Sequence, residues 1–286
     1  MWIKGARPRT LPAAIAPVAV GTACVSVEAN ATANWSNAIL ALIVSLALQV
    51  AVNYANDYSD GVRGTDDKRV GPLRLVGSGA KTASAVKRAA FLSFGVAAIF
   101  GLILALLTSL WLLVVGVLCI LAGWFYTGGK KPYGYFGLGE VFVFVFFGVV
   151  ATTGTTFVIT EKLTATSFTA SLVVGALACA LLAVNNLRDI DGDTLARKRT
   201  LAVRLGDKKA RSFFVSLFVL ALLAIFVLAL SYPLALLGLV GLGSAFTSIK
   251  RVRSGAVGSE LISVLSMTGR TQILTAITLS IGLILS

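Results

Sequence analysis

Two short stretches hold most of the acidic residues of this 286-residue chain. Seven of its 12 carboxylates fall within them. They are Asp57, Asp60, Asp66 and Asp67 in the first stretch, and Asp189, Asp191 and Asp193 in the second. Carboxylates held close together repel each other unless a cation lies between them. Mg²⁺ prefers oxygen ligands and commonly joins one or two carboxylates to the phosphates of a substrate. The two stretches therefore predict a site for Mg²⁺ and a diphosphate.

The first stretch reads N-Y-A-N-D-Y-S-D-G-V-R-G-T-D-D from Asn53. Asn53 and Asp57 are four residues apart, as are Asn56 and Asp60. Residues at this spacing share a face of a helix, which places the four side chains near the end of one apolar helix. The glycines that follow allow the chain to leave the helix and to bring Asp66 back toward it.

The second stretch reads N-N-L-R-D-I-D-G-D from Asn185. Asn185, Asp189 and Asp193 are again spaced by four, so they are expected to stack on one helix face, whereas Asp191 points elsewhere. An alternative is a solvated rim whose acids pair with the basic loops around them. That alternative does not explain why Asn and Asp recur at a spacing of four in both stretches.

The elements that carry these stretches are predicted to be membrane-spanning helices. Hydrophobic residues make up 57% of the chain and charged residues only 13%, about half of the share in soluble domains, and the mean hydropathy is +0.90. Long apolar runs without alternating polarity indicate an all-α bundle of about nine spans, each near the roughly 20 residues needed to cross a bilayer. The predicted spans are 11–27, 37–56, 84–107, 110–126, 138–158, 167–187, 212–230, 233–249 and 268–285.

The distribution of positive charge predicts the orientation of this bundle. The formal net charge is +13, which in a soluble protein would suggest nucleic acid as a partner. With nine spans and a cytoplasmic N-terminus, however, every Lys and Arg except Lys162 falls on the cytoplasmic side. This partition follows the positive-inside rule. We therefore expect a multi-pass protein of the cell membrane whose acidic stretches face the cytoplasm, with membrane lipid and no nucleic acid as a partner.

The domain organisation is predicted to be simple. The long polar connections 57–83 and 188–211 each follow an apolar helix, begin with acids and continue with basic residues. This echo predicts one membrane-embedded domain over 1–286, made of two roughly equivalent halves that meet at a central site. The chain contains no His, so catalytic work falls on carboxylates, Lys, Arg and Tyr.

Five motifs, in order, resemble the UbiA superfamily of membrane prenyltransferases along essentially the whole chain, and within it the menaquinone-pathway branch. They are R-P-R-T-L-P-A, N-D-Y-S-D-G-V-R-G-T-D-D, G-P-L-R-L-V, Y-T-G-G-K-K-P-Y-G-Y-F-G-L-G-E, and N-N-L-R-D-I-D-G-D with T-L-A-V-R-L-G. The resemblance implies transfer of a polyprenyl group from polyprenyl diphosphate to 1,4-dihydroxy-2-naphthoate, with loss of diphosphate and CO₂. Another aromatic acceptor such as 4-hydroxybenzoate is the alternative.

The resemblance also implies roles for the acidic stretches. The Mg²⁺ ligands would be Asn56, Asp60, Asp66, Asp189 and Asp193, and the catalytic residues Asp57, Asp60, Asp189 and Asp193. The first motif of the family is usually N-x-x-x-D-x-x-x-D. Here position 64 is Gly where the third member is expected, and Asp66 follows two residues later. Asp66 is the favoured ligand, and Asp67 remains the alternative.

Substrate-binding roles follow from the same resemblance. They fall on Arg9, Asn53, Asn56, Arg74, Tyr126, Lys131, Tyr133, Asn185, Arg188 and Lys198. Arg74, Lys131, Arg188 and Lys198 would neutralise the diphosphate. Arg9 would hold the acceptor carboxylate, Asp57 would orient or deprotonate its phenol, and Tyr126 and Tyr133 would flank the allylic cation or the ring. The alternatives are an interfacial marker for Arg9, belt residues for the tyrosines and a topology signal for Lys131.

Two other functional classes fit the sequence less well. CDP-alcohol phosphatidyltransferases carry D-G-x-x-A-R, but here three residues separate Asp191-Gly192 from Ala196-Arg197, and the later acids are missing. A transporter would place ionisable residues within the spans. Mid-span ionisable residues are nearly absent from the predicted helices, so an enzyme is favoured.

Overall fold

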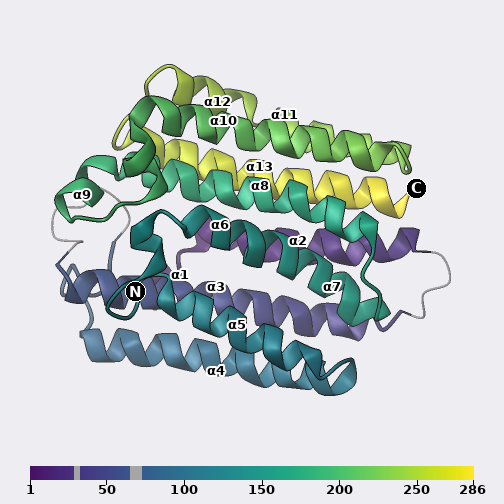
Figure 1. Cartoon of the computed structure of the whole chain (residues 1–286), viewed down its shortest axis with the longest axis horizontal. Coiled ribbons are helices and arrows are strands. Elements are labelled where there is room, and N and C mark those ends of the chain that lie inside the picture. Colours follow the sequence, from purple (N-terminus) through teal and green to yellow (C-terminus); the bar gives the residue numbers. More distant parts are fainter. Residues whose placement is uncertain (29–32, 65–72) are drawn as a thin grey trace.

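A computed structural model describes residues 1–28, 33–64 and 73–286. Within these ranges the chain is built of helices and no strand is present, which confirms the all-α class. The longer helices form an elongated bundle whose termini lie at opposite ends of the long axis (Figure 1). We call the end that holds the N-terminus and α9 the polar end, and the other the far end.

The helices are α1 Trp2–Ala6, η1 Pro8–Thr10, α2 Pro12–Cys24, η2 Val25–Val27, α3 Ser36–Val62, α4 Ala83–Leu107, α5 Trp111–Phe125, η3 Tyr133–Phe136, α6 Gly139–Val143, η4 Phe144–Val150, α7 Ala151–Thr160, α8 Ala165–Arg188, α9 Ile190–Leu195, α10 Leu201–Ala229, η5 Pro233–Leu237, α11 Gly238–Gly243, α12 Phe246–Arg253 and α13 Glu260–Ile284.

Judged by length and composition, fewer described helices could cross a membrane than the nine spans predicted. Every predicted range overlaps helical structure. Five described helices are long and apolar enough to cross a membrane, or up to seven if each of two bent helix pairs forms one span. α5 is a shorter apolar helix of 15 residues, about 22 Å long against the roughly 30 Å of a hydrocarbon core. The nine-span count and the side of the N-terminus therefore stay predictions.

Threonine caps mark where three of the long helices begin. The hydroxyl oxygens of Thr82, Thr164 and Thr200 accept hydrogen bonds from the backbone N–H three residues later, at the starts of α4, α8 and α10. Such caps satisfy backbone donors that have no partner inside the helix. Two of these starts, those of α4 and α10, are at the polar end (Figure 1).

The π-helical turn η4 between α6 and α7 lies where two glycines bring helices into contact. A Cβ on Gly148 would lie 2.5 Å from the Cα of Gly175 in α8. Small residues allow membrane helices to pack this closely. The close approach fixes the α6–α7 segment against α8, and α8 carries the second acidic stretch.

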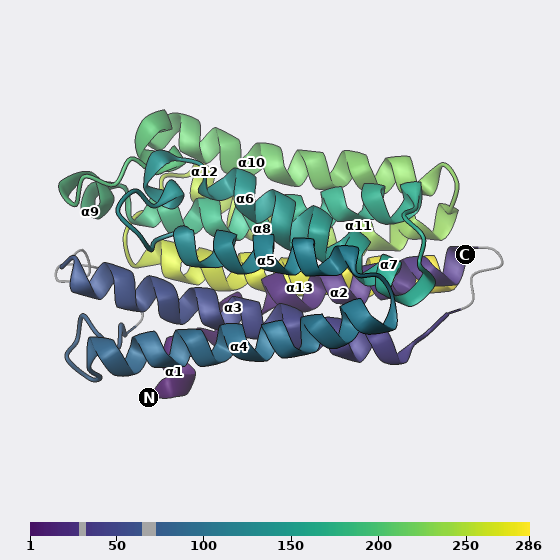
Figure 2. The ribbon, with the colours of Figure 1, turned by 60° about the horizontal axis from the view of Figure 1, so that its bottom comes forward.

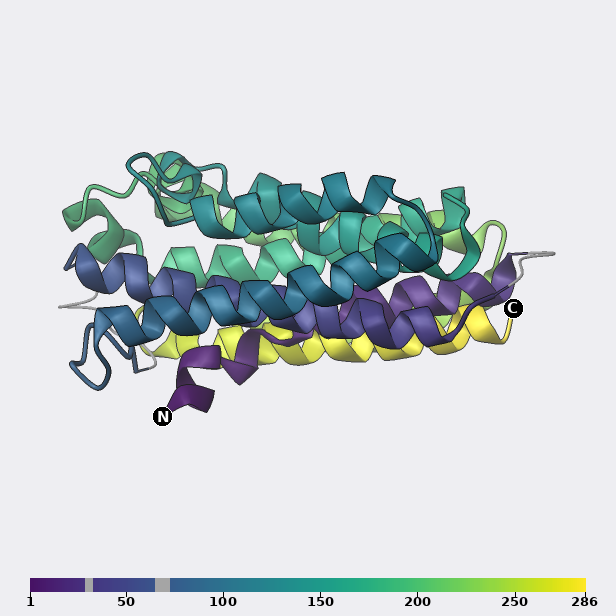
Figure 3. The ribbon, with the colours of Figure 1, turned by 90° about the horizontal axis from the view of Figure 1, so that it is seen from below.

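Two layers of packing hold the acidic stretches. The largest apolar core gathers around α8, with residues of α2, α10 and α13. In α8, 78% of the most apolar 18-residue stretch is buried, against 28–39% in the other four candidate spans. A second core joins α3 to α4, which run side by side in Figures 2 and 3. The first acidic stretch thus belongs to the α3–α4 layer and the second to the α8 layer.

Candidate active site

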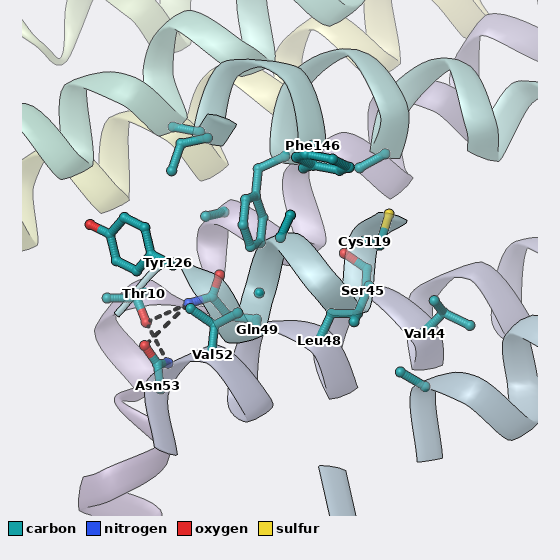
Figure 4. Close-up of a pocket in the computed structure, with 18 of the residues that line it drawn as sticks. Thr10, Val44, Ser45, Leu48, Gln49, Val52, Asn53, Cys119, Tyr126 and Phe146 are labelled. Atoms are coloured by element: carbon teal, nitrogen blue, oxygen red, sulfur yellow. Dashed lines mark hydrogen bonds between the residues drawn. The ribbon is translucent and has the colours of Figure 1, made fainter. Parts of the chain in front are cut away.

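A cavity of about 970 Å³ lies between the two layers. Residues of α1, η1, α2, α3, α4, α5, η3, α6, η4, α7, α8 and α13 line it. Its walls are mainly apolar, as the part formed by Val44, Leu48, Val52 and Phe146 shows (Figure 4). The described lining residues include no Asp or Glu but five cationic ones, which come from the N-terminal segment, the α3–α4 connection and the end of α8. These cationic residues are Lys4, Arg7, Arg9, Arg74 and Arg188.

The positive lining and the apolar walls suit an anionic group joined to a long apolar chain. Arginine side chains recognise phosphate and carboxylate through paired N–H donors. Removing a hydrocarbon chain from water contributes about 0.8 kcal/mol for each buried CH₂. The cavity can therefore hold an amphipathic substrate with its charged group at the polar end.

The Asp60 carboxylate joins the first acidic stretch to the second half of the chain. Its Oδ1 accepts hydrogen bonds from the Tyr135 hydroxyl at 2.7 Å and from Lys198 Nζ at 2.9 Å. Arg74 Nη2 lies 3.9 Å from Oδ2. Lys198 also lies over the Tyr135 ring, 4.7 Å from its centroid. Burial, and next the Asp60 carboxylate, raise the pKa of Tyr135 above its usual value, so that its hydroxyl stays a donor.

The Asp57 carboxylate contacts backbone N–H groups and does not line the cavity. It is fully buried, and its two carboxylate oxygens accept hydrogen bonds from the backbone N–H groups of Leu75 at 2.8 Å and Val76 at 3.0 Å. It is not among the residues that line the cavity. Since Leu75 directly follows Arg74, these contacts fix the segment that presents Arg74 to the cavity. These contacts are compatible with a positioning role for Asp57, and its role toward an acceptor phenol stays a prediction.

The spacing of four predicted that the second acidic stretch would form one continuous helix face. The structure does not show such a face. α8 ends at Arg188, and Asp193 lies in the separate short helix α9. Arg188 donates to both carboxylate oxygens of Asp189, at 2.7 and 2.8 Å, and to Asn185 Oδ1 at 2.8 Å. The helix breaks at Asp189, whose N–H donates to the Asn186 carbonyl three residues back and whose backbone ψ angle is 7°. Asp191 is exposed, away from this group.

The tyrosines and the lysine predicted to bind substrate in the segment after α5 occupy different positions. Tyr126 and Tyr133 line the cavity, with ring centroids 5.6 Å apart in an edge contact. The Tyr133 ring stacks on Phe142 at 3.9 Å, and its hydroxyl donates to the Ala122 carbonyl at 2.8 Å. Both tyrosines thus lie inside the molecule rather than in an external aromatic belt. Lys131, by contrast, is exposed and outside the cavity lining.

The structure brings together many, though not all, of the residues expected from the sequence. The predicted site residues that line the cavity are Arg9, Asn53, Asn56, Arg74, Tyr126, Tyr133, Asn185 and Arg188. Those that lie outside its lining are Asp57, Asp60, Lys131, Asp189, Asp193 and Lys198. The predicted ligand Asp66 and its neighbour Asp67 lie outside the described residues. Asp60 and Asp189 nonetheless contact the cavity through Arg74 and Arg188.

Several polar residues at the site had no role predicted from the sequence, although Arg7, Thr10 and Tyr135 lie within the quoted motifs. Tyr135, Arg7, Thr10 and Gln49 lie beside Asp60 or Asn53. Gln49 precedes Asn53 by four residues, so the helical spacing that identified Asn53 and Asp57 extends back to it. Thr10 and Arg7 had no such signal, because they reach α3 only through the packing of the N-terminal segment.

The donor set fits Mg²⁺ in its chemistry. Among the described residues no three His, Cys, Asp or Glu side chains are close enough to hold a metal ion. Mg²⁺ does not need such a cage, because it keeps several waters and takes one or two carboxylates together with substrate phosphates. Asn56, Asp60, Asp189 and Asp193 offer only oxygen ligands of this kind. Each half of the chain therefore contributes suitable donors.

Comparisons with known proteins bear on the whole chain. Residues 14–260 match the model of the UbiA prenyltransferase family. The chain is 50% identical to a 1,4-dihydroxy-2-naphthoate octaprenyltransferase of Mycobacterium tuberculosis, over 96% of this chain and 94% of that protein. The protein of the same name from Escherichia coli is 35% identical over 100% and 95%. A UbiA homolog from Archaeoglobus fulgidus, solved bound to GPP and Mg²⁺, shares the fold with a TM-score of 0.72 at 14% identity, over 100% and 99%.

Proposed function

Since the chain belongs to the UbiA prenyltransferase family, we propose that it transfers a polyprenyl group from polyprenyl diphosphate to 1,4-dihydroxy-2-naphthoate. The products would be diphosphate, CO₂ and the demethylmenaquinol used in menaquinone synthesis. Membership confirms the resemblance drawn from the five motifs, and the chain is a multi-pass membrane enzyme. Relatives 50% and 35% identical over nearly the full chain are named for this acceptor.

One observation carries the proposal beyond the names of relatives. The cavity combines a polar end lined by cations with a long apolar body. A prenyl diphosphate has the same division between its diphosphate and its hydrocarbon chain. Of the predicted diphosphate-binding cations, Arg74 and Arg188 line the polar end, and Lys198 lies one contact away through Asp60. The geometry therefore supports binding of the diphosphate between α3 and α8.

Diphosphate binding would redistribute the ion pairs at this end. Arg188 is held by Asp189 and Asn185, and Lys198 by Asp60. The substrate offers these cations additional oxygen partners, while the carboxylates become available to Mg²⁺. Bound Mg²⁺, held by Asp60, Asp189, Asp193 and Asn56 with Asp66 as a further ligand, would neutralise the charge that develops on the leaving diphosphate.

The chain's own residues would organise the transfer step. The C–O bond of the prenyl diphosphate breaks, and its electron pair leaves with the diphosphate toward Arg74 and Arg188. The ring carbon that carries the carboxylate then bonds to the allylic carbon. Loss of CO₂ returns the pair of the broken C–C bond to the ring. Tyr126 and Tyr133 present aromatic rings to the cavity, where they can stabilise the allylic cation.

The membrane side of the site is part of the proposal. The basic residues of the predicted inside loops support a location of the polar end at the cytoplasmic face of the cell membrane. A water-soluble naphthoate would then enter from the cytoplasm, and the prenyl chain from the bilayer. The location would be tested by cysteine labelling: a single cysteine at exposed Lys131 should react with an impermeant maleimide only when the cytoplasmic face is accessible.

Product identification tests the reaction. Membranes containing the chain would be incubated with Mg²⁺, prenyl diphosphates of several lengths, and an equal mixture of 1,4-dihydroxy-2-naphthoate and 4-hydroxybenzoate. Mass spectrometry should find the prenylated, decarboxylated naphthol, and chelation of Mg²⁺ should stop its formation. Prenylated 4-hydroxybenzoate as the main product would overturn the proposed acceptor. Absence of either product, together with no release of diphosphate, would overturn the proposed activity.

A further inference from the structure

A small hydrogen-bond network ties the N-terminal segment to α3 at the cavity wall. Gln49 Nε2 donates to Thr10 Oγ1 at 3.2 Å and to Asn53 Oδ1 at 3.4 Å. Asn53 Nδ2 donates to Thr10 Oγ1 at 3.0 Å and to the Ala6 carbonyl at 2.8 Å. The three side chains, drawn in Figure 4 with the bonds that join them to one another, all line the cavity.

Two backbone carbonyls set the direction of every bond in this network. A carbonyl oxygen can only accept, so the Thr10 hydroxyl must direct its hydrogen to the Arg7 carbonyl, 2.9 Å away. The amide nitrogen of Asn53 must likewise face the Ala6 carbonyl, which turns its oxygen toward Gln49. Gln49 meets two acceptors and therefore faces both with its nitrogen. The orientation of the Gln49 amide therefore follows from the chemistry of its partners.

The remaining atom of this amide is the carbonyl oxygen Oε1 of Gln49. Figure 4 shows it directed away from Thr10 and Asn53, toward the cavity on the side of Tyr126 and Phe146. The Gln49 residue is only 7% exposed, so this acceptor is held in a mostly apolar surrounding. A buried acceptor contributes most when a ligand supplies the matching donor, and costs free energy when the ligand does not.

We propose that Gln49 Oε1 accepts a hydrogen bond from a ring hydroxyl of the aromatic substrate, and that Thr10 and Asn53 are positioning residues that hold the amide in this orientation. The inference rests on the proposed function, because it requires a hydroxylated aromatic acid in the cavity. The proposal assigns to Gln49 the recognition of the ring hydroxyl. The arginines at the polar end recognise only negative charge. A hydroxyl donates to this oxygen, and a hydrogen or a methoxy group at the same ring position does not.

A simpler interpretation is that Gln49 only ties the N-terminal segment to the helix. The amide nitrogen accounts fully for that tie. A residue with a structural role alone would not need an oxygen directed at the cavity. The two interpretations differ in one measurable respect, namely whether the side chain discriminates between ligands that have and lack the hydroxyl.

Competitive inhibition by substrate analogues tests the proposal without depending on the reactivity of their rings. The full-length enzyme in lipid nanodiscs with Mg²⁺ would be inhibited with 1-hydroxy-2-naphthoate and 4-hydroxy-2-naphthoate, each lacking one hydroxyl of the proposed acceptor. Wild-type protein should bind one analogue at least about tenfold more weakly than the other. Gln49→Met, similar in size but unable to accept this bond, should make the two inhibition constants equal. The KM for prenyl diphosphate should not change.

Two further variants separate discrimination from folding. Thr10→Val removes the hydroxyl that orients the amide and should reduce discrimination between the analogues, whereas Thr10→Ser should retain it. Gln272→Met is the matched control: this buried glutamine of α13 has no hydrogen-bond partner among the described residues and does not line the cavity. It should keep the wild-type ratio.

The outcomes separate the two proposals. Wild-type ratios in both Gln49→Met and Thr10→Val would overturn the role of Gln49 while leaving the reaction intact. Equal inhibition by both analogues in the wild type, with normal turnover, would do the same. A wild-type enzyme that forms no product from 1,4-dihydroxy-2-naphthoate would instead overturn the proposed function.

Discussion

Lys198 donates a hydrogen bond of 2.9 Å to Asp60, joining residues 138 positions apart in the sequence. Both side chains are largely buried, 11% and 6% exposed. Asp60 is the last acid of the first stretch that lies on α3. Lys198 follows the second acidic stretch and lies beyond the end of α9. This ion pair therefore links the two halves of the chain beside the cavity, where diphosphate and Mg²⁺ would compete for its members.

The first prediction concerns this competition. Replacing Lys198 with Met leaves the buried Asp60 carboxylate with less positive charge around it, a change that costs roughly 3–5 kcal/mol when a buried pair loses one partner. Thermal stability without metal should fall, and added Mg²⁺ should recover more of it than in the wild type. Scanning fluorimetry with EDTA or Mg²⁺ measures both effects. The same response to Mg²⁺ in variant and wild type would show that the metal and Lys198 do not share Asp60.

The carboxylate itself is the subject of the second prediction. Asp60→Asn removes the charge that both Lys198 and Mg²⁺ would use, and should lower kcat/KM for prenyl diphosphate by roughly a hundredfold or more. Asp191→Asn is the control, because Asp191 belongs to the acidic stretches but is exposed. It should retain near wild-type turnover. Comparable losses in both variants would indicate that the stretches act through general negative charge rather than through a defined site.

A third prediction separates the two roles considered for Asp57. Its oxygens hold the N–H groups of Leu75 and Val76 beside Arg74. In Asp57→Asn one oxygen becomes an NH₂ group that faces a donor, which should cost about 1–3 kcal/mol and displace Arg74. The KM for prenyl diphosphate should rise, by up to about the factor of 5 to 150 that this cost represents, with the acceptor KM unchanged. A raised acceptor KM, together with an altered pH profile of turnover, would instead support Asp57 as the base that deprotonates the acceptor phenol.

The site illustrates what helical spacing can predict and what it cannot. The intervals of four placed Asn53, Asn56 and Asp60 correctly on one helix, α3, because their positions follow from helix geometry alone. The same rule failed at Asp189, where α8 ends, since a local 3₁₀-type bond there interrupts the spacing. It also gave no sign that Asp57 serves Leu75. That contact depends on how a polar loop folds back, which side-chain periodicity does not record.

Tyr135 lies within the quoted motif Y-T-G-G-K-K-P-Y-G-Y-F-G-L-G-E, but no role was predicted for it, for a related reason. Its contact with Asp60 joins η3 to α3, two elements brought together only by tertiary packing. The cation-rich loops were correctly expected near the acids, yet which cation meets which acid could not be predicted. Surface charge patterns indicate a region, and only packing selects partners within it.

A fourth prediction follows from the direction of the Tyr135 pKa. Burial and the Asp60 carboxylate raise this pKa above the ordinary value of 10.0. Below pH 10 the phenol is protonated in both folded and unfolded states, so its contribution to stability is fully present. That contribution is lost as pH rises through the folded pKa. Unfolding temperature should therefore fall more steeply above pH 10 in the wild type than in Tyr135→Phe, and equal slopes would contradict the raised pKa of Tyr135.

The last prediction concerns the length of prenyl chain that the cavity accepts. Gly154 of α7 lines the cavity, and a Cβ at this position would meet no atom within 4 Å. A larger side chain can therefore occupy space that the apolar substrate would otherwise fill. The end of a long prenyl chain would meet this side chain and a short chain would not, so the penalty should grow with chain length. Gly154→Leu should raise the KM for long prenyl diphosphates and leave that for short ones nearly unchanged.

The control for this effect is another glycine with open space. Gly243 of α11 also meets no atom within 4 Å of a built Cβ but does not line the cavity. Gly243→Leu should show no dependence on chain length, because the added side chain leaves the substrate volume intact. Product analysis with an equimolar series of prenyl diphosphates measures both variants. A uniform loss across all lengths in Gly154→Leu would mean that the prenyl chain does not extend past α7, and would shift its path toward α4 and α5.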